Sequence, residues 1–210
     1  MQARMTLRKM ETREMRESRE TQASAVSEVL LTAEQIQRRV GELGAAISAD
    51  YTGLDPLLVG ALRGVTLFMA DLMRAVTIPL QVDFLAISSY GAPAQPDWPA
   101  LPGTHRVVRI LKDLETDIAG RHVLFVEDMV DTGLSLNYML RLLRDRQPAS
   151  LHVCTMFNKP RLRLFNLPLR YVGFELPDRY VVGYGLDYRQ LYRNLPFVGV
   201  LSAGVLLSND

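Results

Sequence analysis

A short acidic turn between two apolar patterns contains the residues best suited to chemistry in this 210-residue sequence. Glu127 and Asp128 follow the continuous apolar run 123–126, and the stretch 131–135, Asp-Thr-Gly-Leu-Ser, leads into a helical pattern. Backbone N–H groups at a helix start, together with hydroxyl side chains, form a natural cradle for phosphate. Two adjacent carboxylates beside such a cradle would repel a bare polyphosphate, so they fit ribose hydroxyls or Mg²⁺ better. The turn therefore indicates a site for a phosphorylated sugar, although an acidic turn alone more often marks only a capped helix.

The elements around this turn are predicted from the period of the apolar residues. Strand-like runs occupy residues 57–61, 80–88, 107–111, 123–126 and 151–157, and helical spacing marks residues 32–47, 65–76 and 136–143. Strands that alternate with helices imply right-handed βαβ units, and hence an α/β fold with a mostly parallel twisted sheet flanked by helices. Ligands of such sheets bind beyond the carboxyl ends of the strands, which is where the acidic turn lies.

The composition is that of one ordinary soluble domain, with 48% hydrophobic and 22% charged residues. The apolar runs are far too short to cross a bilayer, so no membrane segment is expected. Lysine and arginine number 24 against 23 aspartates and glutamates, and this balance gives no argument for a nucleic-acid partner. The single cysteine, Cys154, excludes an internal disulfide, and the first residues lack the apolar core of a signal peptide. We therefore expect a cytoplasmic protein.

The first residues differ from the rest of the chain, because methionines are interspersed with arginines and glutamates without a steady apolar stripe. We expect residues 1–28 to form a charged, disordered tail and residues 29–210 to form a single domain. Order is expected to begin at Thr32, which has the spacing of a capping box with Gln35. A chain that starts near Ser27 is therefore expected to remain active.

Four segments resemble one enzyme family. The stretch 123–135 closely resembles the phosphoribosyl pyrophosphate signature of the type I phosphoribosyltransferases, in the form typical of the hypoxanthine-guanine branch. Residues 58–64 are similar to the pyrophosphate loop of that family, and residues 84–91 to the strand that enters its mobile catalytic lid. Segments between residues 171 and 196 are similar to its purine-binding end. The segments stand in the family's order and span about residues 30–201, so the resemblance implies the family's fold, with a small purine-binding hood.

The resemblance also implies which residues form the site. Those matching the family's phosphoribosyl pyrophosphate contacts are Leu62, Arg63, Gly64, Glu127, Asp128, Asp131, Thr132, Gly133, Leu134, Ser135 and Arg193. Those matching its purine contacts are Lys159, Tyr180, Val181 and Asp187. The lid would begin at Ser89 and Tyr90, and the carboxylates matching those that hold Mg²⁺ are Glu127, Asp128 and Asp187.

The activity that the resemblance implies belongs to purine salvage. It is Mg²⁺-dependent transfer of the 5-phosphoribosyl group from phosphoribosyl pyrophosphate to N9 of hypoxanthine or guanine, which gives IMP or GMP and pyrophosphate. Asp131 would be the general base or hydrogen-bond acceptor for purine N7, and Lys159 would donate to the 6-oxo group. Tyr180 would stack on the purine, and Arg193 would hold pyrophosphate. These residue types suit an oxocarbenium-like reaction at the ribose carbon, and the family implies a homodimer or homotetramer.

Two other functions fit parts of the pattern. A regulator could keep this fold as a ligand sensor and bind nucleic acid, but Asp131, Lys159, Asp187 and Arg193 together favour an enzyme. A transferase could instead prefer xanthine or adenine, and Lys159 argues against adenine because the 6-amino group is itself a donor. A lysine before a proline is most often a solvated charge, but its place after a parallel strand favours a ligand-facing role. The choice among hypoxanthine, guanine and xanthine stays open, because it depends on backbone geometry near Val181 and Asp187.

The expected lid, residues 91–105, departs from the family pattern because its prolines recur every third residue from Pro93 to Pro102. Three residues per turn is the polyproline II period, and a lid stiffened by proline explains it better than a docking site for a partner domain. We expect this lid to be mobile and to close over bound substrates. Arg63 stands where the family often has lysine, but that loop is expected to act through backbone groups.

Overall fold

The computed structural model describes residues 25–90 and 107–207. The predicted lid and its prolines lie outside these residues. The described chain forms two compact units: one is Gln37–Asp178, and the other joins the residues up to Ile36 with those from Arg179 onward. The larger unit therefore contains the acidic turn, and the smaller unit contains most of the predicted purine contacts.

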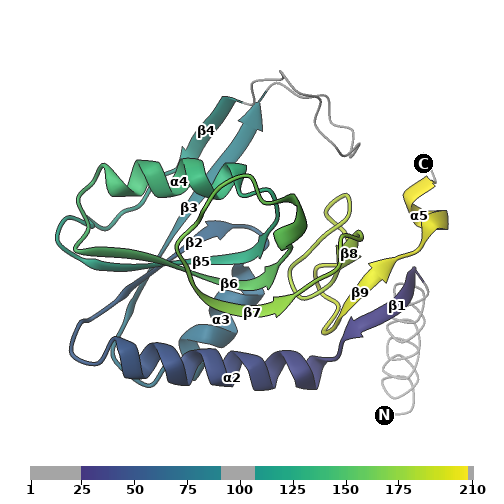
Figure 1. Cartoon of the computed structure of the whole chain (residues 1–210), viewed down its shortest axis with the longest axis horizontal. Coiled ribbons are helices and arrows are strands. Elements are labelled where there is room, and N and C mark those ends of the chain that lie inside the picture. Colours follow the sequence, from purple (N-terminus) through teal and green to yellow (C-terminus); the bar gives the residue numbers. More distant parts are fainter. Residues whose placement is uncertain (1–24, 91–106, 208–210) are drawn as a thin grey trace, which may run out of the picture. The chain divides into compact units, whose positions relative to one another are not determined.

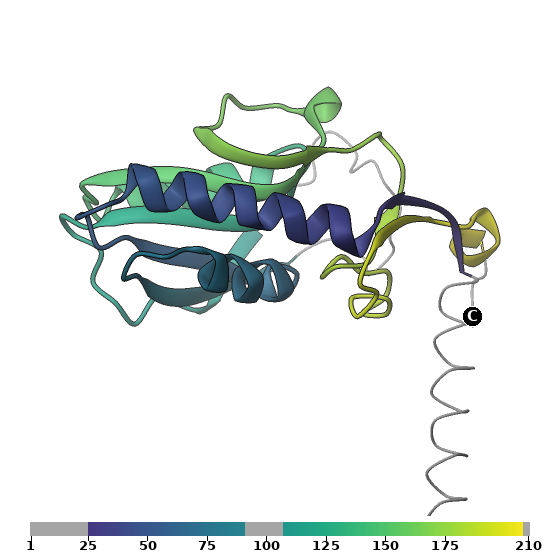
Figure 2. The same cartoon turned by 90° about the horizontal axis from the view of Figure 1, so that it is seen from below.

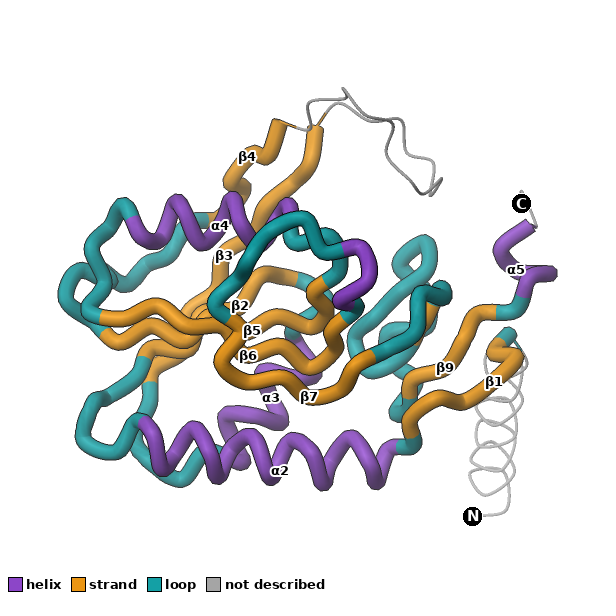
Figure 3. Tube along the Cα trace, viewed as in Figure 1, coloured by secondary structure: helices purple, strands orange, loops and turns teal. Residues whose placement is uncertain are grey.

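A six-stranded sheet runs through the larger unit in the order β4-β3-β2-β5-β6-β7 (Figures 1 and 3). Its strands are β2 (Leu57–Leu62), β3 (Gln81–Tyr90), β4 (Val107–Lys112), β5 (His122–Val130), β6 (Ser150–Asn158) and β7 (Leu169–Glu175). All neighbouring strands are parallel except β4, which pairs antiparallel with β3. The predicted α/β fold with a mostly parallel sheet is thus confirmed. Because β2, β5 and β6 are parallel neighbours, the residues that follow them lie at the same edge of the sheet.

Helices cover both faces of this sheet, with α2 (Ala33–Asp50) and α3 (Thr66–Ala75) on one side and α4 (Leu134–Arg144) on the other (Figures 1 and 2). A Cβ on Gly44 of α2 would lie 2.6 Å from the Cβ of Ala75, so glycine allows the chain to pack closely here. The face of α4 toward the sheet buries Leu136, Met139, Leu140 and Leu143 in a core with strand residues such as Phe125 and Val153. The helical period of these apolar residues is therefore satisfied by burial against the sheet.

The smaller unit contains a three-stranded antiparallel sheet in the order β1-β9-β8. Its elements are β1 (Val26–Leu31), β8 (Val181–Val182), β9 (Val198–Leu201) and the short helix α5 (Ala203–Leu207). A core of buried residues, Ala25, Val182, Tyr188, Leu195 and Leu201, holds these elements together. The unit is thus assembled from two ends of the described chain.

The predicted strands and helices of the larger unit are all present, with shifted ends. Strand β5 continues past the apolar run to Val130, so Glu127 and Asp128 lie within the strand rather than after it. Strand β7 and the 3-10 turn η1 (Pro160–Leu162) were not predicted. The predicted capping box is confirmed: Gln35 Oε1 accepts from the Thr32 N–H at 2.8 Å, and Thr32 Oγ1 accepts from the Gln35 N–H at 3.3 Å.

Order begins ahead of the capping box, at the unpredicted strand β1. Val26 pairs with Leu201 in β9, so residues 26–28, which the sequence placed in the tail, belong to a sheet. We expect a chain that begins at Ala23 to keep its activity and melting temperature, because it retains all of β1. A chain that begins at Thr32 should be inactive and should melt at a lower temperature. In that chain β9 would lose its hydrogen bonds to β1, and the core of the smaller unit would lose Ala25. Thermal unfolding gives the melting temperature of each shortened chain, and nucleotide formation gives its activity. Equal melting temperatures and equal activities of the two chains would contradict this role of β1.

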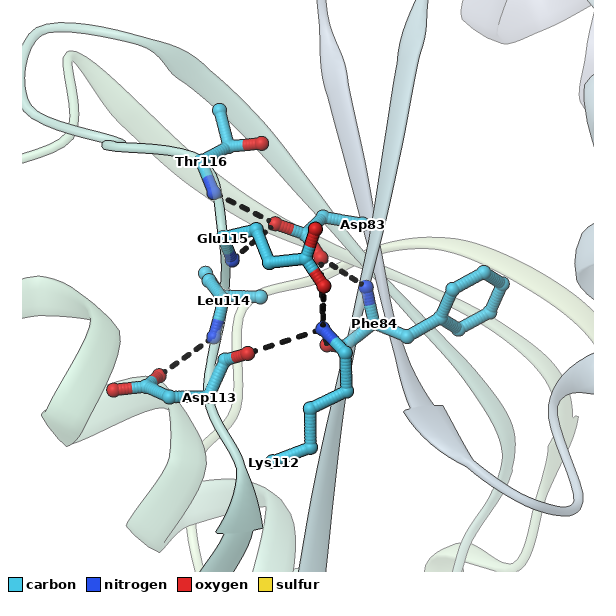
Figure 4. Close-up of polar contacts among 7 residues, drawn as sticks. All are labelled: Asp83, Phe84, Lys112, Asp113, Leu114, Glu115 and Thr116. Atoms are coloured by element: carbon cyan, nitrogen blue, oxygen red, sulfur yellow. Dashed lines mark hydrogen bonds and ion pairs between the residues drawn. The ribbon is translucent and has the colours of Figure 1, made fainter.

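A buried carboxylate fixes the root of the β3–β4 hairpin (Figure 4). Asp83 is 7% exposed, and its oxygens accept from the backbone N–H groups of Phe84, Glu115 and Thr116 at 2.7, 2.8 and 2.9 Å. Lys112 Nζ lies 3.4 Å from the same carboxylate and donates to the Phe84 carbonyl at 2.9 Å. Burial alone would raise the pKa of Asp83, but the backbone hydrogen bonds prevail and lower it. The carboxylate thus ties the turn after β4 to the start of β3.

We expect Asp83→Asn to lower the free energy of unfolding by about 2 kcal/mol at pH 7, since hydrogen bonds to a charged group are lost. The folded pKa lies below the unfolded value of about 3.9, so the carboxylate stabilises the fold fully above that value. This stabilisation is lost as the pH falls through the folded pKa. Urea unfolding from pH 7 to pH 3 measures the difference between parent and variant, which should shrink toward acid.

Asp117→Asn is the matched control, because Asp117 is exposed and its carboxylate accepts a bond from the Ala119 N–H at 3.0 Å. A pH-independent difference for Asp83→Asn, or an equal loss in the control, would contradict the role assigned to Asp83.

Candidate functional site

Two carboxylates lie near the carboxyl end of β5. Glu127 pairs in register with Thr155 of β6, and its Oε2 atom is buried without a hydrogen-bond partner in the described part of the chain. Burial, and then the negative charge of Asp128, raise the pKa of Glu127 well above its usual value. An unpartnered buried carboxylate is costly, and a cation or a ligand hydroxyl would remove that cost.

The loop after β5 presents the start of a helix. Gly133, the residue before α4, has a φ of 79° in the left-handed region, and it offers no side-chain cap. Thr132 Oγ1 is 3.4 Å from the Leu134 N–H. The first N–H groups of a helix have no intrahelical acceptor, and the helix dipole favours an anion there. The stretch 131–135 thus leads into a helix start that favours an anion, and the phosphate cradle stays a prediction.

The loop after β5 is hydrogen-bonded to the segment that follows β6. The Val130 carbonyl accepts from the Lys159 N–H at 2.9 Å, and the Thr132 carbonyl accepts from the Leu164 N–H at 3.0 Å. A Cβ on Gly133 would lie 2.7 Å from a methyl group of Leu167. Glycine is therefore needed at position 133 both for its positive φ and for this close packing.

Asp131 and Lys159 follow the neighbouring parallel strands β5 and β6, at this edge of the sheet. The Asp131 Oδ1 atom is buried with no hydrogen-bond partner among the described residues, and Lys159 is 7% exposed. Burial raises the pKa of Asp131, which the cations of Lys159 and Arg163 partly oppose. Burial lowers the pKa of Lys159, which the carboxylates of Asp131 and Asp178 oppose. Burial thus disfavours the charge of both side chains, and each of the two charges favours the other.

The predicted pyrophosphate contacts Leu62–Gly64 begin at the last residue of β2, the parallel neighbour of β5. The peptide bond between Leu62 and Arg63 is cis. The Arg63 carbonyl accepts from the Thr66 N–H at 3.2 Å and from Thr66 Oγ1 at 2.6 Å, so the loop turns directly into α3. In the larger unit, neighbouring parallel strands therefore end at this loop, at the carboxylates of β5 and at Lys159. Ser89 and Tyr90 are at the end of β3, where the described residues stop.

The other predicted purine contacts lie in the smaller unit. Tyr180 is 39% exposed, its hydroxyl donates to the Asp187 carbonyl at 3.1 Å, and its ring meets Tyr188 edge-on with 5.5 Å between centroids. Val181 is buried in β8. The tyrosine ring is thus held at its hydroxyl and at one edge, which suits a stacking surface.

Asp187 and Arg193 are paired with each other. Asp187 Oδ1 lies 2.7 Å from Arg193 Nη2, and Asp187 Oδ2 accepts from the Gln190 N–H at 2.8 Å. Arg193 also donates to the Gly185 carbonyl at 2.7 Å. Both side chains would have to change partners before Asp187 could hold a metal or Arg193 could hold pyrophosphate.

The carboxylates of β5 fit Mg²⁺ better than Asp187 does. Within the described residues, no three His, Cys, Asp or Glu side chains gather into a metal cage. Mg²⁺ is usually held by one or two carboxylates together with substrate phosphates, so such a cage is not required. The unpartnered Oε2 atom of Glu127, next to Asp128, matches that arrangement.

Among the described helices, none is long and apolar enough to span a membrane.

Arg163 was not predicted as a site residue, yet it donates to two carbonyls of the loop after β5. No sequence signal marks it, because its partners in the loop are backbone carbonyls.

This chain is similar in sequence and in structure to proteins of one family. Residues 27–189 match the phosphoribosyl transferase domain family. The hypoxanthine-guanine phosphoribosyltransferase of Mycobacterium tuberculosis is 48% identical over 186 residues, which cover 86% of this chain and 88% of that protein. The Bacillus subtilis protein of the same name is 42% identical over 180 residues, covering 86% and 96%. The crystal structure of a hypoxanthine phosphoribosyltransferase from Staphylococcus aureus superposes with a TM-score of 0.80 at 40% identity, covering 87% and 95% of the two chains.

Proposed function

Because the chain belongs to the phosphoribosyltransferase family and is a transferase of its hypoxanthine-guanine type, we propose that it makes IMP or GMP in purine salvage. The reaction transfers the 5-phosphoribosyl group from phosphoribosyl pyrophosphate to N9 of hypoxanthine or guanine and releases pyrophosphate. The observation that carries this proposal is the Oδ1 atom of Asp131, which is buried without a hydrogen-bond partner among the described residues, together with the buried Lys159 and the start of α4, where Gly133 provides no side-chain cap. This arrangement combines a proton acceptor, a donor and a phosphate cradle in one unit.

In this proposal the larger unit binds the ribosyl donor. The loop 131–135 receives the 5-phosphate on its backbone N–H groups, and Glu127 and Asp128 face the ribose hydroxyls and Mg²⁺. When bound, Mg²⁺ would neutralise negative charge on the pyrophosphate leaving group. The backbone of Leu62–Gly64 holds the pyrophosphate, assisted by Arg193 once it leaves Asp187.

The purine contacts are proposed from the same family match. Asp131 accepts the hydrogen bond or proton of N7, and Lys159 donates to the 6-oxo group. Tyr180 stacks on the ring, the backbone of Val181 contacts the base edge, and Asp187 holds a second Mg²⁺. The last assignment requires Asp187 to exchange its bonds with Arg193 and Gln190 for the metal.

Xanthine is a second candidate base. A solved hypoxanthine-guanine-xanthine phosphoribosyltransferase superposes with a TM-score of 0.74 at 37% identity, covering 85% of this chain and 99% of that one. Small-molecule substrates, a cytoplasmic location and a homodimer or homotetramer are part of the same proposal. Sedimentation of the purified protein measures the assembly.

A panel of bases tests the proposed reaction. The protein is incubated with phosphoribosyl pyrophosphate, MgCl₂ and one of hypoxanthine, guanine, xanthine or adenine, and nucleotide formation is followed by chromatography. We expect IMP and GMP to form, and chelation of the metal with EDTA to stop their formation. Absence of nucleotide with every base would overturn the proposal, and nucleotide formation unaffected by EDTA would remove Mg²⁺ from it.

A further inference from the structure

The guanidinium of Arg163 bridges three groups around the loop after β5. Its Nε donates to the Asp131 carbonyl at 3.0 Å, and its Nη2 donates to the Val130 carbonyl at 3.3 Å. The same Nη2 makes a short hydrogen bond to Oδ1 of Asn158, the last residue of β6. One side chain thus ties the start of the loop to the neighbouring strand.

Arg163 also packs against the glycine of the loop. Its Cδ lies 3.3 Å from the position of a Cβ on Gly133, beside the methyl group of Leu167. Together with the Leu164 N–H bond to the Thr132 carbonyl, these contacts engage every residue from Val130 to Gly133 from the same stretch of chain.

These bonds fix the direction of the loop's peptide groups. The carbonyls of Val130, Asp131 and Thr132 all accept from the segment 159–164, so they point toward that segment. The N–H of a planar peptide points opposite to its carbonyl. The N–H groups of the following residues are therefore directed away from Arg163, and a guanidinium suits this task because its donors form a rigid planar fork.

We propose that Arg163 is a positioning residue that holds the loop 130–133 in the shape that presents its N–H groups to the 5-phosphate of the ribosyl donor. This inference rests on the proposed function and extends it to a residue that touches no substrate. The hydrogen bonds of Arg163 are made to the 5-phosphate loop and to Asn158, and its charge also lowers the pKa of Asp131.

The test compares two anions that bind different loops. Ribose 5-phosphate and inorganic pyrophosphate are titrated separately, in MgCl₂, into the parent protein and into Arg163→Met by calorimetry. Without the charge-assisted bonds of the guanidinium the loop should lose the shape that binds the 5-phosphate, so the Kd for ribose 5-phosphate should rise at least about tenfold. The Kd for pyrophosphate should stay within about twofold, since Leu62–Gly64 makes no contact with Arg163 in this proposal.

Arg161→Met is the matched control, because Arg161 is an exposed arginine two residues away in η1. It removes the same charge without touching the loop, and both Kd values should remain at the parent's. Arg163→Lys is the second variant: a lysine keeps the charge but lacks the planar fork, so it should weaken ribose 5-phosphate binding and spare pyrophosphate.

Every outcome either supports or overturns the positioning role of Arg163. Selective weakening of ribose 5-phosphate binding in the Arg163 variants supports the proposal. Equal weakening of both ligands, no weakening, the same weakening in Arg161→Met, or failure of both Arg163 variants to fold overturns it. If the parent itself binds neither ligand and forms no nucleotide, the proposed function fails, whereas a fully active parent with unaffected Arg163 variants refutes the positioning role alone.

Discussion

Asp131→Asn is expected to lower kcat by about 10²- to 10⁴-fold, which is the usual contribution of a positioned acid or base. The asparagine keeps the size and polarity of the side chain but cannot accept a proton at pH 7. In the parent, Oδ1 of Asp131 is buried with no partner among the described residues, so it is poised for a ligand. Steady-state rates with hypoxanthine measure the effect.

Binding of phosphoribosyl pyrophosphate should survive this substitution, because the proposed phosphate contacts are backbone N–H groups and the Asp131 carbonyl that Arg163 holds is retained. The control is Asp117→Asn, an exposed carboxylate remote in sequence from the loop, which should keep the parent rate. Turnover of Asp131→Asn near the parent value would remove this carboxylate from the mechanism.

The larger unit could be predicted well from the sequence because its signals are local. A fully buried parallel strand appears as a continuous apolar run, as Val123–Val126 does, and the turn after it must lie at the ligand-binding edge. The capping box of Thr32 and Gln35 is equally local, since both of its hydrogen bonds span three residues. In such places the residues that cause the structure are neighbours in the sequence, so their pattern predicts it.

Strand β1 was missed because its pattern is weak and its partner is distant. It is exposed at Ser27, Glu28 and Val29, and it is stabilised by pairing with β9, about 170 residues later in the sequence. Side-chain alternation cannot reveal a strand that is held mainly by backbone hydrogen bonds at the edge of a small sheet. Arg163 was missed for a related reason, since its hydrogen bonds to the loop are made to carbonyl groups that every residue possesses.

The pairing of Asp187 with Arg193 could not be predicted from the sequence. The resemblance assigns the two side chains to different ligands, yet here they bind each other and close the turn around Gly185. Gly183 and Gly185 have positive φ values of 102° and 97°, which let the chain reverse within this turn. Only the folded geometry brings the two charges together.

Lys159→Gln is expected to lower kcat/KM for hypoxanthine and guanine by roughly tenfold to a hundredfold and to narrow the preference against adenine. Lys159 is 7% exposed at the end of β6, where its backbone N–H is fixed by the Val130 carbonyl at 2.9 Å. An ammonium can only donate hydrogen bonds and a 6-oxo group can only accept them, whereas the 6-amino group of adenine would set a donor against a donor. The glutamine amide can present either a donor or an acceptor, so the variant should lose rate with 6-oxopurines and discriminate less.

Rates with hypoxanthine and with adenine, measured at one enzyme concentration, give the efficiency ratio that decides the role of Lys159. Arg161→Gln is the control, because it makes the same kind of change at an exposed cation two residues away and should leave the ratio unaltered. Burial lowers the pKa of Lys159, and the carboxylates of Asp131 and Asp178 oppose this effect. The substitution therefore also removes a cation that favours ionised Asp131, and part of the lost rate will be common to all bases. Only the change in the ratio reports on the 6-position, and an unchanged ratio would show that Lys159 does not read it.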